Sequence, residues 1–154
     1  YMAFVRGDGG ERTAEVNLGQ MLTSLTRTAR HTEEAVVIDV PPVTVSVKPN
    51  AFRRLMSNLI NNAVRHGKKV KVAGTVKSHM LTLTVDDDGP GIPPESREEA
   101  FRPFVRLDNA RNLDETGTGL GLAIARDIAH AHGGEIKLED SPLGGLRAVV
   151  QVPV

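Results

Sequence analysis

The sequence predicts a two-layer α/β sandwich, in which helices cover one face of a single sheet. Three segments repeat apolar residues at helical spacing, and about six short runs alternate or concentrate β-branched residues as strands do. Helices and strands follow one another in mixed order, which is typical of a sheet with helices packed on one side. A length of 154 residues fits one domain of ordinary size.

The composition excludes several classes of protein. Lys plus Arg and Asp plus Glu both number 19, so the formal charge is zero, which argues against a dedicated nucleic-acid binder. The chain has no cysteine, which excludes disulfides and thiolate metal sites. No apolar run reaches the ~18 residues of a spanning helix, and the N-terminus lacks a signal-peptide pattern. We therefore expect a chain that is not inserted in a membrane and binds no nucleic acid.

The first half of the chain predicts two helices and four strands. Residues 1–12 contain the flexible polar stretch Gly7-Asp8-Gly9-Gly10 and are expected to be the tail of a preceding element plus a linker, and residues 13–154 form the predicted domain. A helix is expected over residues 17–30 with Asn17 as its N-cap, followed by strands over 36–40 and 43–47 around Pro41-Pro42. The next segments are a helix that begins at Pro49-Asn50 and ends at Gly67, and strands over 69–77 and 81–85 that turn near Ser78-His79.

The second half begins with a long irregular stretch. No regular element is expected between Gly91 and Thr116, and a connection of this length is usually a lid or disordered. A third helix is expected over residues 120–131, ended by Gly133-Gly134, and strands over 135–139 and 146–152 close the chain.

The polar face of the second helix is the first candidate for function. Asn58, Asn61, Asn62 and Arg65 lie opposite its apolar stripe. They could simply form a solvated face. Asparagine, however, is a poor interior helix former, so three of them within five positions indicate that their amide oxygens are needed as neutral ligands.

Asp87 is the second candidate. The alternation of Leu81, Leu83 and Val85 places position 87 on the buried face, where a carboxylate is costly unless it is paired. Asp86, Asp87 and Asp88 could form a metal cluster, but consecutive strand residues alternate faces, so at most Asp86 and Asp88 share a side. The structural alternative is an Asx turn into Gly89, which explains one aspartate but not one on the core face.

The third candidate is the glycine-rich start of the third helix, from Gly117 to Leu122. Glycines there let backbone N–H groups approach an anion, with help from the helix dipole. The segment lacks the lysine of a P-loop and does not follow a strand, so neither the Walker motif nor the Rossmann fingerprint applies. Taken by itself it could equally be a mobile turn.

These segments together resemble the catalytic, ATP-binding domain of bacterial sensor histidine kinases, in the ATPase superfamily shared with gyrase, HSP90 and MutL. Asn58–Gly67 is similar to the N box, Asp87–Ile92 to the G1 box, Phe101–Phe104 to the F box and Gly117–Leu122 to the G2 box. Their order and spacing match, and the resemblance runs from about Val16 to the C-terminus. The stretches 88–95 and 101–106 resemble the osmolarity-sensing branch most.

The resemblance implies a Bergerat-type fold, a mixed and mostly antiparallel sheet of five to seven strands with three main helices on one face. It implies ATP and Mg²⁺ as cofactors: Asn62 would hold Mg²⁺, Asn58 would support the phosphates, and Arg65 would neutralise their charge. Asp87 would accept a hydrogen bond from the adenine amino group, which opposes guanine. The other nucleotide-binding residues would be His66, Gly89, Gly91, Ile92, Arg106, Arg111, Thr116, Gly117, Thr118, Gly119, Leu120, Gly121 and Leu122.

The sequence departs from the family pattern at three places. His66 stands where a tyrosine commonly flanks the adenine, and stacking remains possible there. Asn61 and Asn62 offer two adjacent amides, so register leaves open which one meets the metal. Gly144-Gly145-Leu146 lacks the threonine often found in the third glycine box, a departure expected to matter little.

The expected activity is protein-histidine kinase rather than hydrolase. Hydrolytic members of the superfamily carry a water-activating Glu one turn before the metal Asn, where this chain has Asn58, which cannot act as a base. None of the five histidines lies in a phosphoacceptor motif. The resemblance thus implies a histidine on a separate dimerisation domain, whose last helix would end within residues 1–12. We take Asn58 and Arg65 as the candidate catalytic residues.

The partners implied are ATP, the histidine-bearing dimerisation domain and a response regulator downstream. The family implies a cytoplasmic domain whose parent protein is anchored in the bacterial inner membrane. Two other functions stay open at this point: a non-catalytic nucleotide-sensing module, and an anti-sigma-factor-type serine kinase, against which the long lid and the F box argue.

Overall fold

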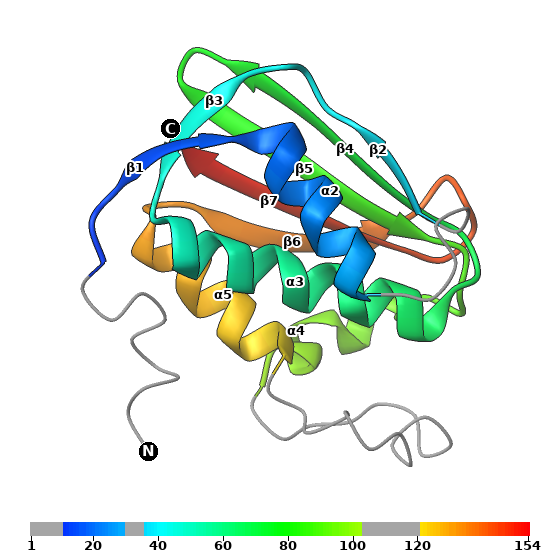
Figure 1. The fold of residues 1–154 in the computed structure, drawn as a ribbon. Helices are drawn as coiled ribbons and strands as arrows, with labels where there is room; N and C mark the ends of the chain where they lie inside the picture. The colour runs from blue at the N-terminus through cyan, green and yellow to red at the C-terminus, as the bar shows by residue number, and fades with distance from the viewer. Residues whose placement is uncertain (1–10, 30–35, 103–120) are drawn as a thin grey trace.

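The structure, a computed structural model, describes residues 11–29, 36–102 and 121–154. Helices α2 (Leu18–Ala29), α3 (Pro49–His66) and α5 (Gly121–Ala131) lie on one face of a five-stranded sheet, with α3 between the other two (Figure 1). The strand order is β2 (Val36–Asp39), β4 (Val70–Lys77), β5 (Met80–Asp87), β7 (Leu146–Pro153) and β6 (Glu135–Asp140). The predicted two-layer sandwich is therefore confirmed.

The sheet is mixed and mostly antiparallel. Only β2 and β4 are parallel; the β4–β5, β5–β7 and β6–β7 pairs are antiparallel. The β4–β5 hairpin turns at the predicted place, where Ser78 and His79 have φ of 50° and 64°. Two positive φ values in succession are typical of a type I′ turn, whose twist matches that of the strands.

The two strands around Pro41-Pro42 belong to different sheets. β2 joins the large sheet, whereas β3 (Thr44–Val47) pairs antiparallel with β1 (Ala14–Asn17), a strand that the sequence pattern did not predict. Neither proline has an N–H to donate to a ladder, and the N–H of Val43 donates to the carbonyl of Pro41 across 2.8 Å. The chain therefore changes direction there without forming a hairpin.

The core lies between the helices and the sheet. The apolar stripe of α3 is buried, and Phe52, Leu55, Met56 and Ile60 have no exposed surface. The facing residues of β5, namely Leu81, Leu83 and Val85, are buried as their alternation predicted. The helix ends also agree with the sequence: Asn17 caps α2 by accepting the N–H of Gln20 at 2.9 Å, and α3 ends at Gly67.

The stretch after Gly91 is more regular than predicted. The structure forms a 3₁₀ turn, η2 (Pro94–Ser96), and a single helical turn, α4 (Arg97–Ala100), so the expectation of an irregular chain was wrong here. Pro94 occupies the first helical position, for which its fixed φ is suited, and Ala100 and Phe101 are buried. A helix of four residues is too short to produce a readable period.

Candidate functional site

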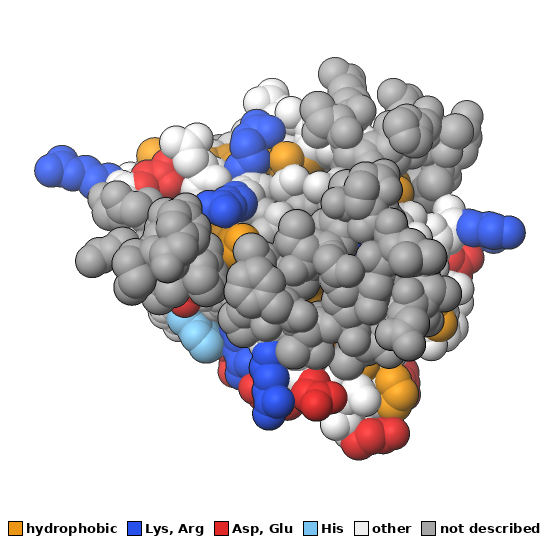
Figure 2. Space-filling model, turned by 90° about the horizontal axis from the view of Figure 1, so that it is seen from below, with side chains coloured by type: hydrophobic (Ala, Val, Ile, Leu, Met, Phe, Trp, Pro, Cys, Tyr) orange, Lys and Arg blue, Asp and Glu red, His pale blue; other side chains and the backbone are white. Residues whose placement is uncertain are grey.

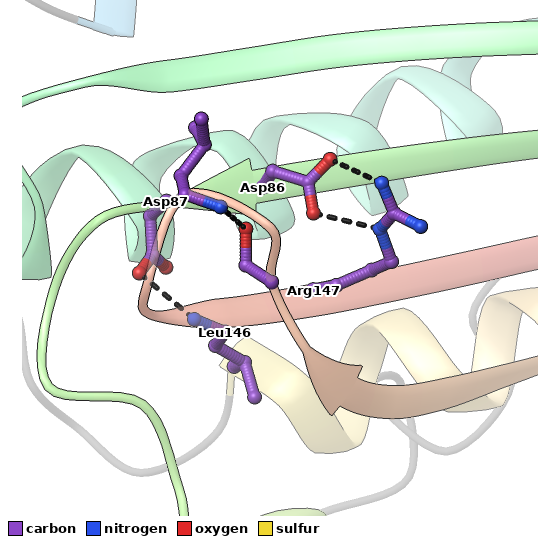
Figure 3. Close-up of polar contacts among 6 residues, drawn as sticks. Asp86, Asp87, Leu146 and Arg147 are labelled. Atoms are coloured by element: carbon purple, nitrogen blue, oxygen red, sulfur yellow. Dashed lines mark hydrogen bonds and ion pairs between the residues drawn. The ribbon is translucent and has the colours of Figure 1, made fainter.

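Asp87 lies at the end of β5 and is buried, as the strand alternation predicted. It is 3% exposed, and its Oδ1 accepts the N–H group of Gly89 at 2.9 Å. The same Oδ1 accepts the N–H group of Leu146 at 3.1 Å (Figure 3). Burial raises the pKa of this carboxyl, and the charges of Asp88 and Asp86 add to that effect, while the two hydrogen bonds oppose it. The hydrogen bond from the Gly89 N–H forms an Asx turn. Asp87 is therefore both the turn residue and the buried carboxylate between which the sequence left the choice open.

Glycines surround Asp87 because there is no room for side chains. A Cβ on Gly145 would overlap the Oδ1 and the carbonyl oxygen of Asp87, and the N–H of Gly145 donates to that carbonyl at 3.1 Å. A Cβ on Gly89 would overlap the carbonyl of His66, at the end of α3. These close approaches join the end of α3, the turn after β5 and the start of β7 into one frame.

The neighbours of Asp87 have separate partners. Asp86, 2% exposed, forms a two-pronged ion pair with Arg147, with Nε to Oδ1 at 2.7 Å and Nη2 to Oδ2 at 3.1 Å (Figure 3). Asp88 Oδ1 accepts the N–H groups of Lys68 at 2.7 Å and Lys69 at 3.0 Å, which lower its pKa. The three aspartates therefore do not act as a metal cluster, and the described residues contain no group of three or more acidic or histidine side chains suited to one.

Arg147 is a residue that the sequence analysis missed. Its position in β7 carries no motif, and its role depends on the register that places it opposite Asp86 across the β5–β7 ladder. The only sequence signal was a basic residue two positions after the final glycine pair, in a strand whose other residues apart from Gln151 are apolar. That signal is too weak to identify a partner.

The polar face of α3 opens toward the start of α5. Asn58, Asn61, Asn62, Arg65 and His66 are all half-buried. The side-chain N–H of Asn58 donates to the carbonyl of Gly121 at 3.3 Å, and that of Asn61 donates to Ser57 Oγ at 3.3 Å within the helix. Asn58 thus links the helix to the end of the predicted glycine-rich segment, while His66 lies beside the turn that follows Asp87.

This donor set fits a magnesium ion that is bound mainly by phosphates. Asn58 and Asn62 are one turn apart, so their amides lie on the same side of α3. The contact to Gly121 uses the nitrogen of Asn58 and leaves the oxygen, which is the atom that ligates hard cations, out of that bond. Mg²⁺ usually takes one or two protein oxygens together with substrate phosphates and water.

Short helix α4 is fixed by two arginines. Arg97 Nε donates to the carbonyl of Ile92 at 2.9 Å, and the same side chain pairs with Asp140. Arg126 of α5 pairs with Glu98 at 2.8 Å and lies 4.5 Å from the ring centre of Phe101, a cation–π contact. The half-buried Ile92, predicted to line the adenine, is therefore held by its backbone.

Several predicted site residues lie outside the described residues. They are Arg106, Arg111, Thr116, Gly117, Thr118, Gly119 and Leu120, together with Pro103 and Phe104 of the F box. The expected lid between residues 105 and 116 falls there too. Gly121 and Leu122 are placed, at the first two positions of α5.

His132 has a structural role. Its Nε2 accepts the N–H of Lys48 at 3.0 Å, its Nδ1 lies 2.9 Å from the carbonyl of Ile128, and its ring meets Phe52 edge to face. The ring therefore ties the end of α5 to the start of α3. His130 is exposed near the end of α5, and His31 lies outside the described residues.

The part of the surface that Figure 2 shows carries both signs of charge, with described Lys and Arg side chains lying near Asp and Glu side chains. This distribution matches the formal charge of zero. None of the helices that the structure describes is long and apolar enough to cross a membrane.

Comparison with known proteins agrees with this geometry. Residues 47–154 match the family described as histidine kinase-, DNA gyrase B- and HSP90-like ATPases. Sensor histidine kinase CpxA of Escherichia coli is 50% identical over 107 residues, which are 69% of this chain and 23% of CpxA. The solution structure of the histidine kinase domain of the E. coli osmosensor EnvZ has a TM-score of 0.68 and 34% identity, covering 93% of this chain and 89% of that one.

A mycobacterial sensor histidine kinase, MprB, shares the fold with a TM-score of 0.76 at 23% identity, over 92% of this chain and 97% of that chain. The chain thus belongs to the histidine kinase-, gyrase B- and HSP90-like ATPase family. Within that family it is the ATP-binding domain of a sensor histidine kinase. It spans about a quarter of the length of the CpxA proteins that it matches.

Proposed function

We propose that this domain binds ATP between α3, the end of β5 and the start of α5, and transfers the γ-phosphoryl group to a histidine on a separate dimerisation domain. The observation that carries the proposal is Asp87, a buried carboxylate held by two backbone N–H groups inside a frame of glycines. Buried carboxyl groups with a raised pKa cluster at functional sites.

The carboxylate explains the choice of base. Oδ1 is engaged by Gly89 and Leu146, and a carboxylate has further acceptor positions for the 6-amino group of adenine. Guanine presents a carbonyl oxygen there, which would face a negative charge. Gly91, with φ of 73°, and Ile92 continue from this point and would line the base.

The phosphates would lie along α3 toward α5. About 12 Å of helix axis separate His66, beside the adenine end, from Asn58, beside Gly121. Asn62 would hold Mg²⁺ between them, Asn58 would support the phosphate end and Arg65 would neutralise charge. When bound, the ion would screen the negative charge of the phosphates that opposes attack by the acceptor.

The acceptor would be a neutral imidazole nitrogen. It forms a bond to the γ-phosphorus while the bond from that phosphorus to the β,γ-bridging oxygen breaks, so ADP leaves. Little proton transfer is needed, and the domain contributes positioning and charge neutralisation. A response regulator would then take the phosphoryl group. The side chain of Asn58 cannot activate water, which supports transfer over hydrolysis.

The test is a titration of the domain with ATP, ADP and GTP, with and without Mg²⁺, followed by thermal unfolding. A ligand at 100 times its dissociation constant should add about 2.7 kcal/mol to the free energy of unfolding. We expect ATP and ADP to stabilise the domain, Mg²⁺ to strengthen the effect of ATP, and GTP to have little effect. Equal stabilisation by GTP would contradict the role of Asp87.

A further inference from the structure

The pair formed by Asp86 and Arg147 lies directly behind Asp87, on the sheet face that the helices do not cover. Asp86 and Arg147 are opposite each other in the β5–β7 ladder, and theirs is the last pair before both strands end at the site. The next residue on each strand takes part in the proposed adenine site. Asp87 on β5 would accept the adenine amino group, and the N–H of Leu146 on β7 donates to Asp87. The ion pair and the candidate recognition group are thus adjacent, on opposite faces.

We infer that Asp86 and Arg147 are positioning residues for base recognition, because they lock the last rung of the ladder and thereby hold the Leu146 N–H against Asp87. This inference rests on the proposed role of Asp87 in binding adenine. Figure 3 shows the arrangement: Arg147 meets both oxygens of Asp86, while the Leu146 N–H points to Asp87.

The geometry of the pair is suited to this role. Both carboxylate oxygens of Asp86 are used, at 2.7 Å and 3.1 Å, so the planes of the guanidinium and the carboxylate are fixed relative to each other. The ammonium of a lysine would neutralise the charge of Asp86 but would not fix the orientation of its carboxylate. The Asp86 side chain is 3% exposed and that of Arg147 is 32% exposed, so solvent weakens the contact little at the carboxylate end.

The ion pair lies where side-chain contacts can act on the start of β7. Beyond Asp86 and Arg147 the β5–β7 ladder has no further Cα pairs. Leu146 pairs with Asp140 on its other side, and the N–H of Gly145 donates to the carbonyl of Asp87, so the ion pair adds to these backbone contacts after a turn that contains Gly144 and Gly145. Glycines leave that turn little intrinsic stiffness. Asp87 is then oriented by N–H groups from Gly89 and Leu146, and the second of these depends on how β7 begins.

The pair also neutralises a charge next to the recognition group. Asp86 is a buried carboxylate one residue from Asp87, and its charge disfavours ionisation of Asp87. The guanidinium of Arg147, whose pKa is raised by its hydrogen bond to Asp86, compensates that charge. Without it, the uncompensated charge of Asp86 would disfavour ionisation of Asp87, and a neutral Asp87 accepts a hydrogen bond from adenine poorly.

The test measures base discrimination, which general loosening of the fold would not change selectively. ATP and purine riboside 5′-triphosphate, which lacks the 6-amino group, are titrated against each protein. The wild type should prefer ATP by roughly ten- to a hundredfold, the range for a hydrogen bond to a charged group. Arg147→Lys keeps the charge and removes the fork, and it should reduce that preference at least about threefold with little change in affinity for the analogue.

A second variant removes the pair without leaving a buried charge. Asp86→Val with Arg147→Met keeps strand propensity and volume, and it should also lose discrimination while unfolding normally. Lys137→Gln is the matched control, because it breaks an exposed ion pair with Glu135 on the same sheet, and it should discriminate as the wild type does. Thermal unfolding without nucleotide identifies any protein that does not fold.

Three outcomes are distinguishable. Reduced discrimination in both Arg147 variants supports the inference. Wild-type discrimination in a folded Arg147→Lys or in the double variant overturns it and leaves the role of Asp87 intact. A wild type that binds both nucleotides equally overturns the proposed role of Asp87 itself, and the inference falls with it.

Discussion

Asp87 has two opposing requirements at the scale of a single residue. As a buried carboxylate it costs free energy in the unliganded protein, which is why its pKa is raised. As an adenine acceptor it must be ionised. Its partners reflect the compromise: two backbone N–H groups reduce the cost, while burial and the charges of Asp88 and Asp86 keep the group poised for a ligand.

Asp87→Asn should therefore separate folding from binding. Its pKa in the folded protein lies above the usual 3.8, so wild-type stability falls as pH rises from 3.8 through the folded pKa. The asparagine variant lacks that loss, and near pH 7 it should be as stable as the wild type or more so, with the difference shrinking toward pH 3.

The affinity of the Asp87→Asn variant for ATP should drop about tenfold or more. Denaturant unfolding against pH and ATP titration measure the two effects; undiminished ATP affinity would contradict the assignment.

The two adjacent asparagines of α3 can be separated in the same way. Asn62 shares a side of the helix with Asn58, whereas the amide of Asn61 is bound to Ser57 within the helix. Asn62→Ala should reduce the ratio of ATP affinities with and without Mg²⁺ to about one, because the protein oxygen on the ion is lost. Asn61→Ala is the control and should keep that ratio. If Asn61→Ala proves the more damaging change, the metal ligand is one residue earlier than proposed.

At the scale of elements, α3 carries most of the site and is secured at its start from two distant segments. Glu11 accepts the N–H groups of Asn50 at 2.8 Å and Ala51 at 2.9 Å, and His132 accepts that of Lys48. Lys48, the N-cap residue, makes no side-chain cap of its own. These contacts therefore supply the partners that the first turn of a helix lacks.

Glu11→Ala should cost about 1 kcal/mol of unfolding free energy, since it removes two capping hydrogen bonds and a negative charge at a helix N-terminus. Glu15→Ala, which removes an equal charge from an exposed position on β1, is the matched control and should have a smaller effect. Denaturant unfolding of the two variants measures both losses of unfolding free energy. Equal small losses would mean that the Glu11 contacts contribute nothing measurable, and Glu11 would then lie outside the domain, as the predicted boundary at residue 13 implies.

The elements also show what local sequence can and cannot predict. The stripe of α3, the cap at Asn17 and the turn at Ser78-His79 depend on neighbours within a few residues, and the structure places them as predicted. β1 was missed because four residues, Ala14–Asn17, become a strand only by pairing with β3. The single turn of α4 was missed because its stability comes from Arg97 and Arg126, which contact distant residues.

At the scale of the whole molecule, the same limit applies to the site. Asp87 and the α3 asparagines could be proposed from the sequence because each disturbs a local pattern. Arg147 could not be found, because its partnership with Asp86 depends on a strand order in which β5 lies next to β7. Sixty-one positions separate the two residues along the chain. Only the folded sheet brings the start of β7 to the end of β5.

The residues present in the chain also limit the reactions that it can carry out without another protein. The chain has five histidines, none of them in a phosphoacceptor motif, and the side chain of Asn58 cannot act as a base. His132 is occupied on both ring nitrogens, by Lys48 and by Ile128. We therefore expect this chain to bind ATP without phosphorylating itself and without hydrolysing the ATP.

Transfer of the phosphoryl group can be tested between two separate proteins. Incubated with γ-labelled ATP, this chain should acquire no acid-labile label and release little phosphate. Adding the histidine-bearing helical domain of a related sensor kinase should transfer label to that domain, because it supplies the acceptor histidine while this chain supplies positioning and charge neutralisation. The two domains are untethered, so the rate should rise with acceptor concentration, as expected when the effective concentration that a linker provides is missing.

The acceptor domain with its histidine replaced by alanine is the control. Acid-labile label on this chain itself would mean that one of its own histidines is an acceptor, and rapid phosphate release without acceptor would mean that a base other than residue 58 activates water.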